Sequence, residues 1–197
     1  MFSFRFRLMP GLLAAVLLAA CASVPPDTAQ QAAPPLRLFT PLPEVFTAGQ
    51  PGAEDWRGIA AKGVTTVINL RLPEELEGRD ERSEVANAGM AYVEVPVAGA
   101  KGLSMEKAQE LRAAILASDG PVLVHCAAGN RAGALLALSL AQAGMTDDAA
   151  MEIGRAAGMT AAEETVREVL RTAPTREPES GDREALCAMV GKATCDS

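Results

Sequence analysis

Short runs of apolar and β-branched residues alternate along the chain with longer segments whose apolar positions recur at helical spacing. The apolar runs predict buried strands at 64–70, 91–97 and 121–126. Helical spacing and helix start and stop signals predict helices at 54–62, 80–88, 104–118, 131–143, 147–157 and 160–171. Because helices separate strands that are apolar throughout, the pattern predicts an α/β fold with a mostly parallel, doubly wound sheet flanked by helices.

Further details of the pattern place the start and the centre of this fold. Folding signals begin near Leu36, and the segment 47–51 is expected to be a turn. Ser104 is expected to cap the helix that follows it. The segment 131–143 is apolar on nearly all sides, which predicts a central helix.

The two ends of the chain differ in composition from the middle and set the expected domain organisation. Residues 1–20 combine two arginines with an apolar run too short to span a bilayer, which is typical of a secretory signal peptide. Residues 21–35 are rich in Pro, Ala and Gln and are expected to form a tether. The folded domain is expected over 36–172, with a linker and C-terminal tail over 173–197.

The boundary between the first two segments, Leu18-Ala19-Ala20-Cys21, resembles the lipobox of bacterial lipoproteins. The resemblance implies cleavage before Cys21, lipidation of its thiol and a periplasmic domain anchored in a membrane. Ala22 after the cysteine implies the outer membrane. The alternative is an ordinary signal peptide cut after Ala20, with Cys21 left unmodified.

The tail contains two further cysteines, Cys187 and Cys195. An oxidising periplasm favours a small disulfide loop between them. The alternative is a pair of free thiols, because sequence spacing does not establish the geometry that a disulfide needs.

Charge and the supply of metal ligands exclude several classes of function. The chain has 18 basic and 25 acidic residues and a formal net charge of −7, which argues against a nucleic-acid partner because such partners need clustered cations. His125 is the single histidine, and no C-x-x-C motif occurs. No metal site and no cofactor are therefore expected.

One segment joins the third predicted strand to the central helix and carries the candidate chemistry: His125, Cys126, Ala127, Ala128, Gly129, Asn130 and Arg131. Gly129 and Asn130 tolerate the left-handed backbone that lets a loop curl. Curled N–H groups at a helix N-terminus form an anion cradle, and they also stabilise a thiolate. Arg131 adds a planar double donor that suits phosphate. Cys126 is therefore a candidate nucleophile aimed at phosphorus or sulfur.

Both residues at the end of the strand have simpler alternatives. Cys126 could be a buried structural cysteine. The side chain of His125 should point to the opposite face of the strand, so it is not expected to deprotonate the thiol. We expect it instead to hold the loop through a hydrogen bond to the loop backbone, the alternative being a core histidine with no functional role.

The segment resembles the phosphate-binding loop of cysteine-dependent protein tyrosine and dual-specificity phosphatases. It is closer to the bacterial phosphatase-like family linked to beta-lactamase hydrolase-like proteins. Five stretches carry the resemblance: 48–51, 63–71, 121–126, 129–135 and 157–159. The resemblance implies a cysteine-phosphatase-like fold and a phosphocysteine intermediate on Cys126. It also implies phosphate binding by the amides of Ala127, Ala128, Gly129 and Asn130 and by Arg131, and a phosphorylated small-molecule or protein substrate, with phosphotyrosine as one candidate.

Two departures from the tyrosine phosphatases bear on activity. The loop between Cys126 and Arg131 has four residues, one fewer than in those enzymes, which changes the size of the cradle. No Asp occurs from 82 to 118, where dual-specificity enzymes carry their general acid. Three acidic residues lie on loops or helix starts and could replace it, although each is more typical of a solvated charge: Glu75, Asp80 and Glu106. Without an acid to protonate the leaving group, we expect weak turnover that favours good leaving groups.

Two alternatives to a phosphatase follow from the same residues. Rhodanese-like sulfurtransferases also place four residues between cysteine and arginine, and the stretch 69–75 resembles one of theirs, although Arg71 and Glu74 there could simply form a local salt bridge. The helices predicted after 146 argue against that family. The second alternative is a catalytically weak module that binds phosphate or phosphoproteins. The missing general acid favours it, whereas the presence of Cys126 argues against it, because a binding module needs no nucleophile.

Overall fold

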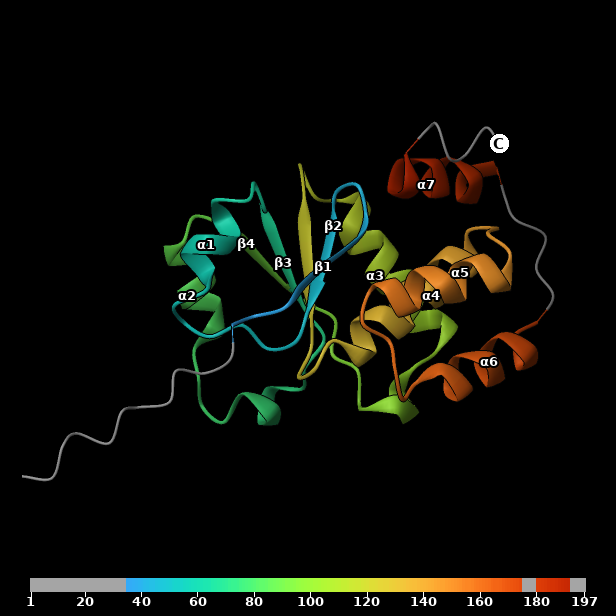
Figure 1. Cartoon of the computed structure of the whole chain (residues 1–197), viewed down its shortest axis with the longest axis horizontal. Helices are drawn as coiled ribbons and strands as arrows, with labels where there is room; N and C mark the ends of the chain where they lie inside the picture. The colour runs from blue at the N-terminus through green and yellow to red at the C-terminus, as the bar shows by residue number, and fades with distance from the viewer. Residues whose placement is uncertain (1–34, 175–179, 192–197) are drawn as a thin grey trace, which may run out of the picture. The chain divides into compact units, whose positions relative to one another are not determined.

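Five strands form a mixed sheet at the centre of the fold, in a computed structural model that describes residues 35–174 and 180–191 (Figure 1). The strands are β1 Leu38–Leu42, β2 Val45–Ala48, β3 Thr66–Asn69, β4 Ala91–Glu94 and β5 Val122–His125. Their order is β1-β2-β5-β3-β4, with β1 antiparallel to β2 and all other neighbours parallel. The expected α/β fold with a mostly parallel sheet is confirmed. The expected signal peptide and most of the tether, Cys21 included, lie outside the described residues.

The two strands at one edge of the sheet were not predicted from the sequence. The expected turn at 47–51 is wrong in part, because Thr47 and Ala48 belong to β2 and pair with β5. The hairpin of β1 and β2 is short, contains Pro41 and Pro43, and has a register shift in its pairing. Proline interrupts the alternation by which a strand is recognised, so this hairpin leaves a weak sequence signal.

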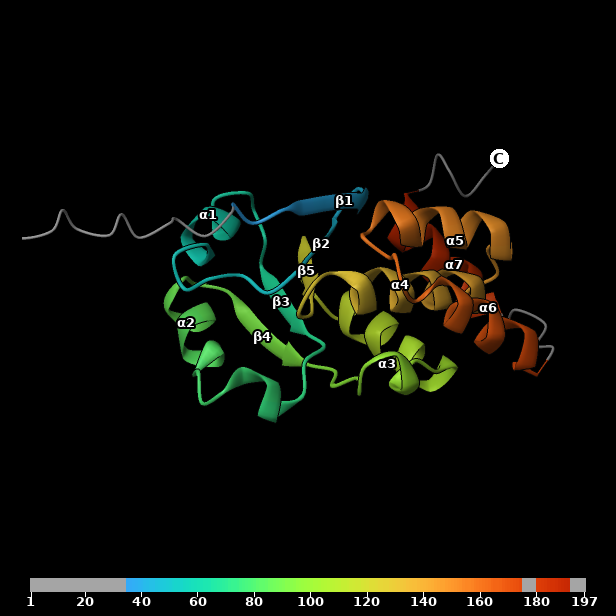
Figure 2. The same ribbon diagram turned by 60° about the horizontal axis from the view of Figure 1, so that its bottom comes forward.

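Both faces are buried at the centre of the sheet, where every residue of β3 and of β5 is buried, which explains why these two strands show no alternation of apolar and polar residues. Val67 and Leu123 point into one hydrophobic cluster, whereas Ile68 and Val124 point into another. Helices α1 Trp56–Ala60 and α2 Glu81–Asn87 supply the first cluster, and α3 Met105–Leu116, α4 Asn130–Gln142, α5 Asp147–Ala156 and α6 Glu163–Thr172 supply the second. Figure 2 shows these two groups of helices on opposite sides of the sheet.

The predicted helices are present, with small shifts at their ends. Ser104 caps α3 as expected, since its Oγ accepts a hydrogen bond from the backbone N of Lys107 at 3.2 Å. Helix α6 begins at Glu163 rather than at 160. The backbone N of Thr160 and that of Ala162 instead donate to the side chain of Asn130, at 2.8 and 3.2 Å.

Helix α4 is central, as its apolar sequence predicts, and residues 131–140 are all buried. Its close packing on α5 depends on two glycines. A Cβ at Gly133 would lie 2.5 Å from the backbone O of Gly154 and from the backbone N of Met159. A Cβ at Gly154 would in turn lie 2.9 Å from the Cβ of Ala137. The small residues therefore let the two helices approach closely and fix the position of α4.

The expected linker and tail at 173–197 contain a further helix, α7 Ser180–Val190. Met189 and Val190 of this helix are buried in the cluster around α4. Arg112 of α3 and Asp182 of α7 form an ion pair of 3.0 Å, with side chains 8% and 7% exposed. This helix therefore contributes to the core. Cys187 is disulfide-bonded, and Cys195, the partner predicted for it, lies outside the described residues.

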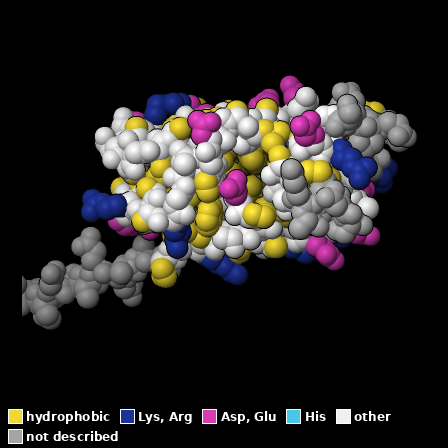
Figure 3. Space-filling model, turned by 90° about the horizontal axis from the view of Figure 1, so that it is seen from above, with side chains coloured by type: hydrophobic (Ala, Val, Ile, Leu, Met, Phe, Trp, Pro, Cys, Tyr) yellow, Lys and Arg dark blue, Asp and Glu magenta, His cyan; other side chains and the backbone are white. Residues whose placement is uncertain are grey.

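The surface of the described residues carries charges of both signs and some exposed apolar side chains. Hydrophobic side chains gather along the middle of the face seen in Figure 3, with Asp, Glu, Lys and Arg dispersed around them. Over 35–174 and 180–191, no helix has both the length and the apolar character that crossing a bilayer requires.

Candidate functional site

The candidate nucleophile lies where β5 ends and the loop to α4 begins. Cys126 is 1% exposed, and its Sγ accepts a hydrogen bond from the backbone N of Gly129 at 3.2 Å. Gly129 has a φ of +84°, the left-handed conformation expected from its position. The loop therefore curls back on the sulfur and points an N–H group at it.

The mouth of the loop is open even though the sulfur itself is buried. Ala127 and Ala128 are exposed. Among the hydrogen bonds of the described residues, none is donated by the backbone N of Ala127 or of Ala128. Amides at the start of a helix are the kind of group from which an anion cradle is built, and binding of an anion by these two stays a prediction.

The end of β2 braces the loop from the side. The backbone N of Gln50 donates to the backbone O of Ala127 at 3.1 Å, and Gly49 forms a bridge with Ala128. A Cβ at Gly49 would lie 3.2 Å from the Ala127 backbone O, so this close approach favours glycine. The pattern at 48–51, which predicts a turn and carries part of the family resemblance, gives no sign of this contact with the loop.

Arg131 points inward from the first turn of α4 and is 8% exposed. Its guanidinium donates to both carboxylate oxygens of Glu75, at 2.6 and 2.8 Å. It also donates to the backbone O of Val97 at 2.8 Å and to that of Leu70 at 3.3 Å. Arg131 is therefore held in place by the segments that follow β3 and β4.

Electrostatics match this geometry. The hydrogen bonds from Arg131 outweigh burial and lower the pKa of Glu75 from 4.5 to about 2. Glu75, together with Cys126, raises the pKa of Arg131. The guanidinium thus lies close enough to Cys126 to interact with it, and both groups of the Glu75–Arg131 pair are charged at neutral pH.

None of the three acidic candidates has the environment of a general acid. Glu75 does reach the site, but its pKa of about 2 leaves it ionised at neutral pH. Asp80 caps α2, where its carboxylate accepts hydrogen bonds from Ser83 that lower its pKa. Glu106 is exposed in the first turn of α3. Glu75 is therefore the partner of Arg131 rather than a proton donor.

His125 has a different role from the one expected. Its Nε2 lies 2.9 Å from Oε1 of Glu81, and both side chains are fully buried. The ring also makes an edge-on contact with Trp56, with 6.0 Å between the ring centroids. The expected hydrogen bond to the loop backbone is not among those of the described residues, because the ring faces the cluster around α1 and α2.

Glu81 is a carboxylate held inside the protein by several donors. Burial alone would raise its pKa, but His125 and hydrogen bonds from Gln50 and Tyr92 outweigh burial and lower it. The distance from the Tyr92 hydroxyl to Oε1 of Glu81 is 3.2 Å. The Tyr92 hydroxyl in turn accepts a hydrogen bond from Nδ2 of Asn69 at 2.8 Å. The sequence does not indicate this role for Glu81, because nothing in its position along α2 distinguishes it from a solvated charge.

The side chain of Asn130 connects the loop to a neighbouring segment of the fold. Its Oδ1 accepts from the backbone N of Thr160 and of Ala162, which ties the loop to the segment before α6. Nearby, Oγ1 of Thr47 donates to the backbone O of Ala157 at 2.8 Å. These bonds join the segment between α5 and α6 to the loop and to β2.

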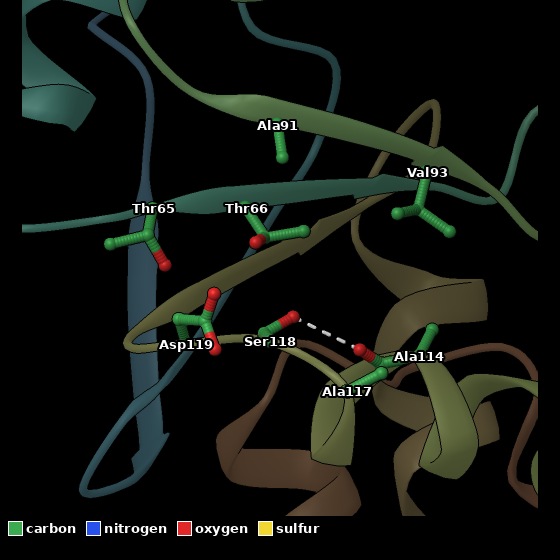
Figure 4. Close-up of a pocket in the computed structure, with 8 residues that line it drawn as sticks. All are labelled: Thr65, Thr66, Ala91, Val93, Ala114, Ala117, Ser118 and Asp119. Carbon is green, nitrogen blue, oxygen red and sulfur yellow. Dashed lines mark hydrogen bonds between the residues drawn. The ribbon is translucent and has the colours of Figure 1, made fainter.

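Other candidate sites are weaker. Within the described part of the chain, no three His, Cys, Asp or Glu side chains lie together so as to hold a metal ion. A hollow of about 340 Å³ lies at the amino ends of the parallel strands (Figure 4). It is lined by Thr65, Thr66, Ala91, Val93, Ala114, Ala117, Ser118 and Asp119. Since Cys126 follows the carboxyl end of β5, this hollow is at the opposite edge of the sheet from the loop.

Comparison with known proteins gives the same fold and the same class of domain. Residues 36–145 match the family described as "Beta-lactamase hydrolase-like protein, phosphatase-like domain". The beta-lactamase hydrolase-like protein of Xylella fastidiosa is 38% identical over 96 residues, which is 47% of this chain and 22% of that protein. The corresponding protein of Agrobacterium fabrum is 33% identical over 95 residues, 46% of this chain and 22% of its own length. The match thus spans about a fifth of each relative.

Solved structures of phosphatases share the architecture. A candidate phosphatase of Neisseria meningitidis superposes with a TM-score of 0.58 at 24% identity, covering 66% of this chain and 94% of its own. One from Shewanella putrefaciens gives 0.53 at 26% identity, with coverages of 70% and 93%. TpbA of P. aeruginosa, solved as a cysteine-to-serine variant in complex with phosphotyrosine, gives 0.55 at 19% identity, with coverages of 78% and 90%. The fold is therefore one that cysteine-type phosphatases use.

Proposed function

Because the chain belongs to the family of phosphatase-like domains of beta-lactamase hydrolase-like proteins, we propose that it is a cysteine-dependent phosphatase that hydrolyses phosphate monoesters. The sulfur of Cys126 attacks phosphorus while the bond to the leaving oxygen breaks, and the departing oxygen takes its proton from water. A water molecule then attacks the phosphocysteine, which releases inorganic phosphate and restores the thiolate.

One observation carries this proposal: Cys126, the left-handed Gly129 and Arg131 converge on one loop with a thiol at its base. The amide of Gly129 lies 3.2 Å from Sγ and stabilises its negative charge. The exposed amides of Ala127 and Ala128 offer donors for the phosphoryl oxygens. Arg131 supplies a fixed positive charge from the first turn of α4. We extend the proposal to phosphotyrosine as a candidate substrate, since TpbA was solved with that ligand.

The test compares two reactions on the full chain. Hydrolysis of p-nitrophenyl phosphate, abolished in Cys126→Ser, is the expected result. If only sulfur transfer from thiosulfate to cyanide depends on Cys126, the phosphatase proposal is wrong. If neither reaction depends on Cys126, the domain is at most a phosphate-binding module.

The second candidate, a rhodanese-like sulfurtransferase, is favoured by one feature, the four-residue spacing between Cys126 and Arg131. A shorter loop changes the anion that fits the cradle. The stretch that resembles that family also supplies Arg71, although its carboxylate neighbour is Glu75, at 3.9 Å, rather than Glu74. The same pair of assays decides between the two enzymes.

We also propose that the domain is a periplasmic lipoprotein, anchored through Cys21 in the outer membrane. The support is the sequence alone: an apolar run that ends in Leu-Ala-Ala-Cys, followed by a polar tether. In a bacterial host, radiolabelled palmitate should enter the wild-type chain and not the Cys21→Ala variant. Equal labelling of both would exclude lipidation at Cys21.

A further inference from the structure

Gln50 makes hydrogen bonds to the cysteine loop, to the buried carboxylate beside His125 and to an arginine near Glu75. Its backbone N donates to the backbone O of Ala127 in the cysteine loop, at 3.1 Å. Its side-chain Nε2 donates to Oε2 of Glu81, the partner of His125. Its side-chain Oε1 accepts from Nη1 of Arg71.

Through Arg71, Gln50 is connected to Glu75, the partner of Arg131. Arg71 Nη2 donates to the backbone O of Glu75, and its Nε lies 3.9 Å from Oε1 of the Glu75 carboxylate. That carboxylate also accepts both hydrogen bonds from Arg131. Arg71 and Arg131 are thus two cations beside one anion. Arg131 makes the close bidentate contact, whereas Arg71 is held back at its longer distance.

Through Glu81, Gln50 is connected to His125, which precedes the candidate nucleophile Cys126. Glu81 is fully buried and lies 2.9 Å from Nε2 of His125, the residue before Cys126. Its other oxygen accepts from Gln50, and the nearest cation to that oxygen among the described ion pairs is Arg79, at 3.9 Å. A buried carboxylate needs such donors, because an unpaired charge inside a protein is strongly unfavourable.

A primary amide suits this position. Its carbonyl accepts from a cation, Arg71, while its NH2 donates to an anion, Glu81. A glutamate would face Glu81 with like charge, and an alanine would leave both groups without this partner. Without Gln50, Arg71 would keep its hydrogen bond to the backbone O of Glu75, but its Nη1 would lose its acceptor and could turn toward the Glu75 carboxylate, where it would compete with Arg131.

We propose that Gln50 is a positioning residue, which orients Arg131 toward an anion in the 127–130 loop by holding Arg71 away from the Glu75 carboxylate. The inference rests on the proposed function, because it assumes that the loop binds a phosphoryl group. It adds a role for Gln50 and Arg71 that neither residue's position in the sequence reveals. Among the described hydrogen bonds, none joins Gln50 to the sulfur of Cys126.

Protection of Cys126 from alkylation measures this orientation without any need for turnover. The full chain is treated with iodoacetamide over a series of inorganic phosphate concentrations, and modification of the Cys126 peptide is followed by mass spectrometry. For Gln50→Ala we expect about a tenfold weaker protection, which is the size of effect expected when a hydrogen bond to a charged group is lost. KM for p-nitrophenyl phosphate should rise by a similar factor. Gln109→Ala, which removes an exposed glutamine from α3, is the matched control and should behave as wild type.

The double variant Gln50→Ala/Arg71→Ala separates positioning from a general structural role. If freed Arg71 is what disturbs Arg131, deleting it should restore most of the phosphate protection that the single variant loses. A purely structural defect would instead persist or grow. Thermal unfolding is recorded for each variant, and Gln50→Met, which keeps the length of the side chain, replaces the alanine if that variant is unfolded.

The outcomes are distinct. Protection equal to wild type in Gln50→Ala, or no rescue in the double variant, overturns the inference while the proposed function stands. Unfolding of both Gln50→Ala and Gln50→Met also overturns it, because Gln50 would then serve stability. A wild-type chain that phosphate does not protect and that hydrolyses no p-nitrophenyl phosphate refutes the proposed function, and the inference falls with it.

Discussion

The pair formed by Glu75 and Arg131 makes a sharp prediction about stability and pH. The change is Glu75→Gln, which keeps the shape of the side chain and removes its charge. Arg131, only 8% exposed, then loses the carboxylate that holds it by two hydrogen bonds of 2.6 and 2.8 Å. The backbone O of Val97 and that of Leu70 remain as its acceptors.

The magnitude follows from the pKa of Glu75. A fall from 4.5 to about 2 corresponds to about 3 kcal/mol in favour of the ionised form in the folded state. The Glu75 side chain is 28% exposed, so solvent screens part of this, and glutamine can still accept a hydrogen bond. We therefore expect Glu75→Gln to lower the free energy of unfolding at pH 7 by about 1–2 kcal/mol.

The dependence on pH gives the prediction its sign. A lowered pKa means that the stabilisation is fully present above the unfolded value of 4.5 and is lost as pH falls toward about 2. Urea denaturation at pH 7, 4 and 3 should show a difference between wild type and variant that shrinks with acidity. Glu74→Gln, an exposed neighbour in the same 3-10 helix, η1 Pro73–Leu76, is the control for the loss of charge. A variant as stable as wild type at pH 7, or a difference that does not change with pH, would refute this account of Arg131.

Three other predictions test separate parts of the molecule. Gly133→Ala should cost about 2–3 kcal/mol in urea denaturation, since its Cβ would meet backbone atoms at 2.5 Å, whereas Gly58→Ala, with open space around it, should be neutral or slightly stabilising. Asp182→Asn should lower the free energy of unfolding by about 2–4 kcal/mol, because it leaves the charge of Arg112 buried, and an unchanged melting temperature would show that α7 contributes little. Among aryl phosphates, kcat/KM should rise steeply with the acidity of the leaving phenol, because no Asp occurs from 82 to 118, and a flat dependence would reveal an acid elsewhere.

The parts of the fold that could be predicted are those with strong local patterns. Strands β3 and β5 are apolar runs, and α4 is apolar on every side, so both signals lie in consecutive residues. The hairpin of β1 and β2 is broken by prolines. Helix α7 begins at the end of a stretch whose composition is that of a linker, and its packing on α3 depends on distant partners such as Arg112.

The same division applies to the site. The cysteine loop could be predicted because residue size and charge within seven consecutive positions determine its shape. The partners of that loop could not, since Glu75 and Arg131 are separated by 56 positions, and no periodicity relates them. Arg71 and Glu75 lie in the stretch that resembles a sulfurtransferase segment, but the sequence does not indicate whether Glu74 or Glu75 pairs with the arginines. The contact of His125 with Glu81 could not be predicted, because β5 and α2 are far apart in the sequence.

The burial of residues 131–140 of α4 has a consequence for substrate specificity. A helix packed on all sides over this length resists rotation or sliding when an anion reaches its first turn, so the cradle should be equally ready for every phosphoryl group. Discrimination among substrates then has to come from the rim, where exposed segments such as 98–102 can change in length and charge without disturbing the interior. Relatives with the same loop should therefore differ in what they hydrolyse mainly through those outer segments.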